Sequence, residues 1–275
     1  MKGTFSGAAR AAGEKPVINE PFSQPGAAAR APLRGSGKPA GRAAAGRAPG
    51  DSRLRAGIRL YCARRWDEAL QELLCVDAGG LGASERVELS YYLGLCFSKL
   101  RKFADALPCL EKVVAFGGDM LRVYQCRMAL AYAHVALGRP KMAEYELRRL
   151  LDLGFESAML FNTMAYASYA RKHYRHAIEF YEKALKLESS NATALNSIGY
   201  ILADTGIDPL KGLRFCRKAV EIQPGNAAYL DSLGWAFHKC REPAAARSWL
   251  RKAHELAPQE AAIAEHLRAA SGGGA

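Results

Sequence analysis

The sequence has no long run of apolar residues. Hydrophobic residues make up 49% and charged residues 24% of its 275 positions, a balance typical of soluble globular proteins. No stretch approaches the roughly 18 consecutive apolar residues that a membrane helix needs. Residues 6–10 read Ser-Gly-Ala-Ala-Arg, where a signal peptide would have its apolar segment. The sequence therefore predicts a protein without a membrane span that resides in the cytoplasm.

The common signatures of catalysis are also missing. The sequence contains no G-x-x-x-x-G-K-[ST], G-x-G-x-x-G, G-x-S-x-G or H-E-x-x-H string, so the usual signs of nucleotide binding, serine hydrolysis and zinc proteolysis are absent. The nearest arrangement to a metal site is His173, His176 and Glu179, which we interpret as the solvated start of a helix. We expect a non-enzymatic protein with no catalytic residue, no metal and no cofactor.

Cysteine spacing gives no sign of a disulfide framework or a zinc site. The chain has seven cysteines, an odd number, and no two of them have C-x-x-C spacing. Because an unpaired cysteine commonly packs as a small apolar residue, we interpret all seven as free, buried thiols.

Residues 1–50 differ in composition from the rest of the chain. They contain 13 Ala, 9 Gly and 6 Pro, with Phe5 and Phe22 as the only aromatic residues. So little apolar surface cannot offset the entropy of ordering, and we predict a disordered tail. Eight Lys or Arg against two Glu give this tail a charge of +6, half of the chain's +12, which leaves the remainder only mildly basic.

From Gly57 onward, small residues recur in two columns. The columns lie 12 residues apart within a copy, or 13 in the fifth copy, and successive copies begin 37, 37, 34, 34 and 35 residues apart. The first column is Gly57, Gly94, Ala131, Ala165, Gly199 and Gly234; the second is Ala69, Ala106, Ala143, Ala177, Gly212 and Ala246. Since two antiparallel helices pack closely only where their crossing lacks a bulky side chain, each copy is predicted to be a helical hairpin.

The larger residues around these columns resemble the tetratricopeptide repeat, which has the same period and a W-x2-L-G-x2-Y, A-x3-F, P pattern. The sixth copy carries Leu230, Leu233, Gly234, Phe237, Ala246, Leu250, Ala253 and Pro258. The resemblance implies an all-α fold: an α-solenoid of about six hairpins with a C-terminal capping helix and a disordered N-terminal tail.

The resemblance also sets the predicted boundaries. The repeat domain covers residues 51–270, with a cap at 261–270 and copies at about 50–83, 87–120, 124–157, 158–191, 192–226 and 227–260. Three extra residues precede the second and third copies, so we expect longer turns around Gly79-Gly80 and Gly117-Gly118. A one-residue insertion lies near Asp208-Pro209, where Pro209 can begin a helix.

In the family that the sequence resembles, the first helix of each hairpin lines a concave groove. Ligand contacts there fall at positions two, five, six, nine, twelve and thirteen of the repeat. The ninth positions are mostly aromatic, and the fifth and sixth carry Asn, Asp, Ser or Thr. The candidate groove residues are Tyr132, Asn162, Thr163, Tyr166, Asn196, Ser197, Tyr200, Asp231, Ser232 and Trp235.

Aromatic rings supply contact area and Asn amides can pair with an extended peptide backbone, so these columns are typical of a peptide-binding surface. The same aromatics could instead pack between hairpins. The family's carboxylate clamp needs Lys and Arg at these positions, which the third to sixth copies lack, so the expected ligand is neutral or apolar rather than an acidic chaperone tail.

We predict a scaffold or adaptor that binds another protein or peptide in the groove, with no small-molecule substrate. Nucleic acid is not the expected partner. Two alternatives stay open: an RNA- or anionic-surface-associated repeat protein that uses the basic tail, and self-association through the edge hairpins.

Overall fold

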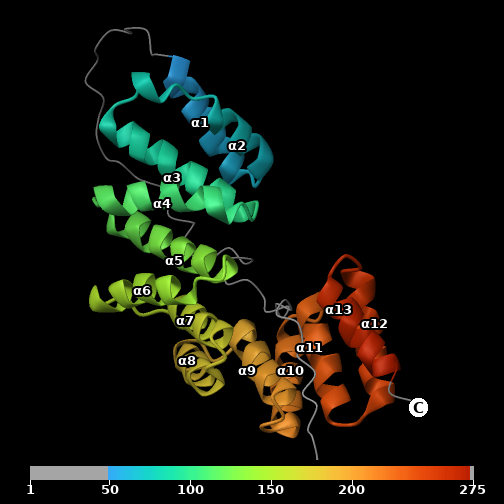
Figure 1. Cartoon of the computed structure of the whole chain (residues 1–275). Helices are drawn as coiled ribbons and strands as arrows, with labels where there is room; N and C mark the ends of the chain where they lie inside the picture. Colours follow the sequence, from blue (N-terminus) through green and yellow to red (C-terminus); the bar gives the residue numbers. More distant parts are fainter. Residues whose placement is uncertain (1–48, 273–275) are drawn as a thin grey trace, which may run out of the picture. The chain divides into compact units, whose positions relative to one another are not determined.

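The computed structural model describes residues 49–272, which contain thirteen α-helices, one short 3-10 helix and no strand (Figure 1). The helices are α1 Pro49–Cys62, α2 Trp66–Leu74, η2 Ala78–Gly80, α3 Ala83–Lys99, α4 Phe103–Phe116, α5 Met120–Ala136, α6 Pro140–Asp152, α7 Ala158–Ala170, α8 Tyr174–Leu187, α9 Ala192–Asp204, α10 Pro209–Ile222, α11 Ala227–Lys239, α12 Pro243–Leu256 and α13 Ala261–Ser271. The expected fold class, an all-helical stack of tetratricopeptide hairpins, is confirmed. None of these helices is both long and apolar enough to cross a membrane.

The described residues form two compact units. The N-terminal unit, residues 49–187, contains α1 to α8, and the C-terminal unit, residues 188–272, contains α9 to α13. The tail predicted for residues 1–50 lies outside the described residues, apart from Pro49 and Gly50, which begin α1.

Each unit is a row of antiparallel hairpins in which every first helix after the opening one also packs on the hairpin before it. In the N-terminal unit, α3 packs on α1 and α2, α5 on α3 and α4, and α7 on α5 and α6. In the C-terminal unit, α11 packs on α9 and α10, while α13 packs on α11 and α12 (Figure 1). A first helix therefore touches helices on both sides, whereas a second helix keeps one face in solvent.

The two columns of small residues mark the crossings inside the hairpins. All the alanines of both columns have 0% exposure. The closest crossing joins α9 and α10, where a Cβ added to Gly199 would lie 2.8 Å from the Gly212 carbonyl oxygen. A Cβ added to Gly212 would lie 2.7 Å from the Gly199 carbonyl oxygen, so two backbones meet here without a side chain between them.

Polar residues just before the helices explain where several of them begin. The side chains of these N-cap residues accept hydrogen bonds from backbone N–H groups of the first turn, which have no partner within the helix. Caps of this kind are Asp119, Ser157, Asn191, Asp208 and Asn226. Pro209 follows Asp208 as the first residue of α10, as the insertion near it predicted.

The extra residues before the second and third copies have different effects. The connection from α2 to α3 is long and includes the 3-10 helix Ala78–Gly80, as expected. The turn predicted to be longer around Gly117-Gly118 is short, because α4 ends at Phe116 and α5 begins at Met120. The additional residues lengthen α3 and α5 to 17 residues, against 13 for α7, α9 and α11.

Candidate functional site

The ten candidate groove residues all lie on first helices. Tyr132 is on α5. The other nine come in threes, from residues 162–166 of α7, 196–200 of α9 and 231–235 of α11. Tyr166 and Trp235 are partly exposed, and the other eight are buried. The partly exposed rings, one in each unit, are therefore where a ligand can first make contact.

In the N-terminal unit, one step of the aromatic ladder is formed. The rings of Tyr132 and Tyr166 stack with centroids 6.0 Å apart and an angle of 22° between their planes. Tyr132 also meets Phe103 edge to face at 5.6 Å. Because Tyr132 is only 7% exposed, its ring packs against the Tyr166 ring and leaves little surface for contact with a ligand.

The polar residues at positions five and six face between neighbouring helices. The hydroxyls of Thr163 and Ser232 donate to the carbonyl oxygens of Met159 and Ala228, four residues earlier in their own helices. Among the described residues, the Asn196 amide oxygen and the Ser197 hydroxyl are buried without a hydrogen-bond partner. A buried acceptor with no partner costs roughly 1–3 kcal/mol, so Asn196 would gain from a donor supplied by a ligand.

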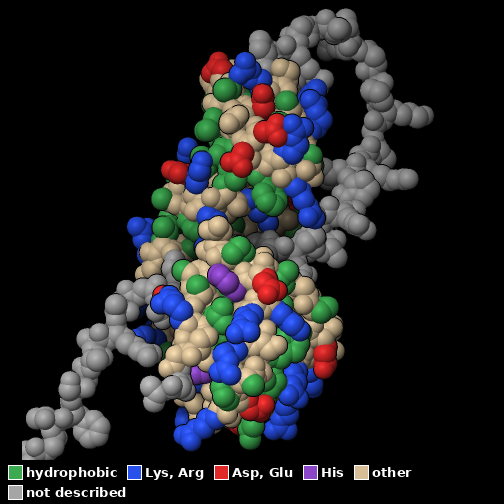
Figure 2. Space-filling model, turned by 90° about the vertical axis from the view of Figure 1, so that its right-hand side faces the viewer, with side chains coloured by type: hydrophobic (Ala, Val, Ile, Leu, Met, Phe, Trp, Pro, Cys, Tyr) green, Lys and Arg blue, Asp and Glu red, His purple; other side chains and the backbone are tan. Residues whose placement is uncertain are grey.

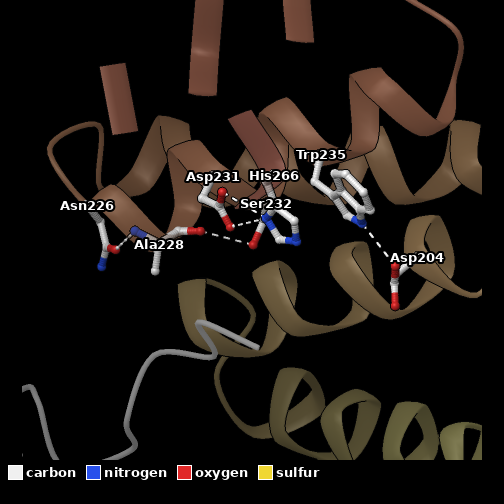
Figure 3. A network of polar contacts seen from close by, with 7 residues as sticks. All are labelled: Asp204, Asn226, Ala228, Asp231, Ser232, Trp235 and His266. Atoms are coloured by element: carbon white, nitrogen blue, oxygen red, sulfur yellow. Dashed lines mark hydrogen bonds and ion pairs between the residues drawn. The ribbon is translucent and has the colours of Figure 1, made fainter. Parts of the chain in front are cut away.

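In the C-terminal unit, Trp235 is the centre of a connected cluster (Figure 3). Its indole N–H donates to Asp204 Oδ1 at 2.9 Å. The Lys239 ammonium lies 3.4 Å from the same carboxylate oxygen and 4.8 Å from the indole centroid. The rings of His238 and His266 both stack on the indole, at 4.9 and 4.2 Å. The indole is thus held in one orientation while part of its surface stays exposed.

The capping helix α13 contributes to this cluster through His266. Its Nδ1 lies 2.9 Å from both carboxylate oxygens of Asp231, which is 1% exposed (Figure 3). A carboxylate removed from water needs such a partner, so the contact satisfies Asp231 and fixes α13 on α11. Asp231, a candidate groove residue, is therefore engaged by the chain's own cap.

Burial lowers the pKa of His238, and the neighbouring Lys239 and His266 lower it further. Its imidazole is accordingly held towards the neutral form, which stacks on the indole without adding a charge. The charged groups at the exposed edge of the cluster are then Lys239 and Asp204, which neutralise each other. The arrangement suits a neutral or apolar group laid against Trp235 better than a charged one.

None of the ten candidate residues lies at position twelve or thirteen of the repeat, although both positions contact ligands in the family. Asp204 is the thirteenth residue of the fifth copy, and His238 and Lys239 are the twelfth and thirteenth of the sixth. All three contact Trp235 or its partners. The residues at positions twelve and thirteen could therefore have been predicted from the sequence. His266 could not, because it lies in the cap, outside the six copies.

Histidine and cysteine give no further site. The exposed rings of His173 and His176 lie 6.0 Å apart, and the part of the chain that the structure describes holds no cluster of three residues suited to a metal ion. All seven cysteines are free, but the expectation that all are buried is wrong: Cys62 and Cys75 are exposed, Cys109 and Cys240 are partly exposed, and only the remaining three are buried. Burial raises the pKa of the Cys96 thiol to about 12.

Comparison with known proteins agrees with this architecture. Residues 160–191 match the profile of the tetratricopeptide repeat. A tetratricopeptide repeat protein from Parabacteroides merdae aligns with a TM-score of 0.66 and 12% identity, over 81% of this chain and 84% of its own. The chain therefore contains a tetratricopeptide repeat and has the fold of tetratricopeptide-repeat proteins. No curated protein sequence matches it.

A second solved structure resembles this chain. It is the APC/C hetero-tetramer Cut9-Hcn1, with a TM-score of 0.65 and 14% identity over 80% of this chain. The match covers 42% of the Cut9-Hcn1 chain, so this protein corresponds to less than half of it. Both likenesses establish the fold.

Proposed function

We propose that this protein is a non-enzymatic scaffold that binds a neutral or apolar segment of a partner protein along its first helices. The contact is centred on Trp235 in the C-terminal unit. The candidate residues of that unit then divide by role: Trp235 touches the ligand, and the buried residues position its indole.

The Trp235 cluster is the observation that carries this proposal. A partly exposed indole supplies a large contact area, and few of its degrees of freedom remain to be lost on binding because Asp204 and two imidazole rings already hold it. Tryptophan is enriched among residues whose truncation costs about 2 kcal/mol or more at interfaces.

The chemistry of the ligand follows from the same cluster. Lys239 is neutralised by Asp204, and the Asp231 carboxylate is buried in its contact with His266, so the exposed part of the cluster offers no unpaired charge that would select for a charged ligand. The Asn196 amide oxygen provides an acceptor for a backbone N–H if the ligand opens a path to it. An extended segment with one apolar side chain against Trp235 fits these features.

The test is partner capture by the full chain from nuclease-treated lysate, with Trp235→Ala as the variant. We expect capture to fall by roughly 30-fold in affinity, which corresponds to about 2 kcal/mol. Because the contact is mainly apolar, capture by the parent protein should persist at about 0.5 M NaCl.

Trp66→Ala is the matched control, since Trp66 is also partly exposed but begins α2, a second helix. It should capture the same partner as the parent, and both variants should keep the helical circular dichroism. Equal loss in the two variants, or full capture by a folded Trp235→Ala protein, would overturn the proposal.

A further inference from the structure

The second helices of the two units carry very different charge. In the N-terminal unit, α2, α4, α6 and α8 together have seven cationic and ten acidic side chains. In the C-terminal unit, α10 and α12 alone have seven cationic side chains against two acidic ones, Glu221 and Glu255. The seven, named here the basic face, are Lys211, Arg214, Arg217, Lys218, Arg247, Arg251 and Lys252.

The cations of the basic face have no acidic partner. Six of them are exposed and Arg247 is partly exposed, and within residues 49–272 none forms an ion pair. Three rest on aromatic rings instead: Lys211 on Phe215, Arg217 on Phe237 and Lys252 on Trp249, at 6.0, 5.2 and 4.6 Å from the centroids. Their charge is therefore available to a molecule outside the chain.

The basic face is regular along each helix. Lys211, Arg214 and Lys218 follow the i, i+3, i+7 pattern that places side chains on one side of α10, and Arg247 and Arg251 do the same on α12. Successive cations are thus about one helical turn, roughly 5.4 Å, apart. Figure 2 shows Lys and Arg side chains gathered on the part of the C-terminal unit that faces the viewer.

On α12 the cations border a shallow hollow. It is lined by Arg247, Arg251 and Lys252 together with Ala244, Ser248 and Glu255. Ala244 and Ser248 are exposed and small, so the backbone of a ligand can approach α12 closely between the cations. The hollow contains no apolar side chain larger than alanine.

This composition separates two classes of partner. Protein interfaces depend on a few buried aromatic or apolar anchors, and the hollow offers none. Binding to a nucleic-acid backbone depends on neutralising phosphates with Lys and Arg and releasing their counterions, which needs no anchor. Arginine, four of the seven cations, matches two phosphate oxygens at once with its planar guanidinium.

We propose that the basic face of α10 and α12 binds the phosphate backbone of nucleic acid without reading its base sequence. This site lies on the folded second helices of the C-terminal unit, and it is distinct from the first-helix surface around Trp235 and from the basic residues 1–48.

The test is fluorescence anisotropy of a labelled poly(U) oligonucleotide with the full chain, over a KCl series from about 50 to 300 mM. The variant combines Arg214→Ala, Lys218→Ala, Arg247→Ala and Arg251→Ala, at positions where alanine favours the helix. We expect affinity to fall at least about tenfold at low salt. The slope of log K against log [KCl] should become shallower by up to about 2.8, since each contact to a single strand contributes about 0.7.

A control variant with the same change in net charge distinguishes this site from a general charge effect. It combines Lys112→Ala, Arg149→Ala, Arg175→Ala and Lys186→Ala, which remove four exposed cations from second helices of the N-terminal unit. We expect this control to bind poly(U) within about twofold of the parent.

Three results would overturn the proposal. Equal losses in both variants would assign the binding to net charge or to residues 1–48. Unchanged binding by the basic-face variant would show that the face is not used. Failure of the parent to bind poly(U), combined with basic-face-dependent binding of labelled poly-glutamate, would make the partner an acidic protein instead.

Discussion

The two units use the same hairpin but place their charged side chains differently. In the N-terminal unit, acidic residues of α6 bind cations of other helices: Glu146 pairs with Arg127 of α5, and Glu144 pairs with Arg171 at the end of α7. In the C-terminal unit, the ion pair of Asp204 and Lys239 joins the ends of the first helices α9 and α11, and among the described residues the cations of α10 and α12 form none. Charges that connect helices serve the fold, and charges left unpaired on one face are free to serve a partner.

The largest expected loss of stability comes from adding a side chain where α9 and α10 cross. A Cβ at Gly199 would lie 2.8 Å from the Cys216 backbone nitrogen and 2.8 Å from the Gly212 carbonyl oxygen, and backbone atoms cannot turn aside as a side chain can. Gly199→Leu should therefore reduce the free energy of unfolding by about 3 kcal/mol or more. Chemical denaturation followed by circular dichroism measures the loss.

The corresponding substitution in the N-terminal unit is Ala177→Leu, at the crossing of α7 and α8. Ala177 has 0% exposure but already accommodates a Cβ, so overpacking should cost about 1–3 kcal/mol, less than at Gly199. If Ala177→Leu unfolds like the parent protein, the register of small residues assigned to that hairpin is wrong.

The register itself could be read from the sequence because close packing is local. Each Gly or Ala column is set by one crossing inside one hairpin, and the residues that cross are about 12 positions apart. The conformation of the three residues added before the third copy could not be predicted in the same way. Whether they extend α5 or loop out depends on how the longer helix packs on α3 and α4, which are far away in the sequence.

The next prediction concerns the paired charges of the N-terminal unit. The side chains of Arg127 and Glu146 are only 14% and 12% exposed, so Glu146→Ala leaves a guanidinium largely buried without its carboxylate. We expect a loss of about 2–3 kcal/mol, somewhat below the cost for a fully buried pair. The difference in thermal midpoint between parent and variant is the measurement.

Arg214→Ala, on the basic face of the C-terminal unit, is the contrasting variant. Arg214 is exposed and has no ion pair among the described residues, so the thermal midpoint should not change. A clear drop for Arg214→Ala, or none for Glu146→Ala, would remove the distinction between charges that hold the fold and charges that do not.

Much less of the candidate site than of the fold could be predicted. The ninth-position aromatics lie on first helices as expected, but Tyr132 lies on α5, which packs on helices of both neighbouring hairpins, and the Tyr200 ring meets His266 of α13, so both are buried. The partner of Asp231 is His266, 35 residues later in a helix that belongs to none of the six copies. The net charge of the chain also concealed the basic face, because a total gives no position: α10 and α12 together carry +5 of the +6 that lies outside residues 1–50.

The smallest predicted effect is a difference in pH dependence between the units. His134 of the N-terminal unit is 4% exposed, and burial is the main cause that lowers its pKa. An unfolded histidine titrates near pH 6.5, so the unfolded chain takes up this proton before the folded chain does. The contribution of His134 to stability is therefore complete above about pH 6.5 and is lost as the pH falls towards the lower pKa of the folded state.

The measurement is the thermal midpoint from about pH 7.5 to 5.5 for the parent and single Gln variants of His134, His238 and His173. His134→Gln should flatten the fall in midpoint the most, whatever its effect at neutral pH. His238→Gln should flatten it less, because burial also lowers the pKa of His238 but its ring is partly exposed. The variant of the exposed His173 is the control for replacing a histidine at the surface. If His238→Gln flattens the fall in thermal midpoint more than His134→Gln does, burial of the imidazole is not the main cause of the loss of stability at acidic pH.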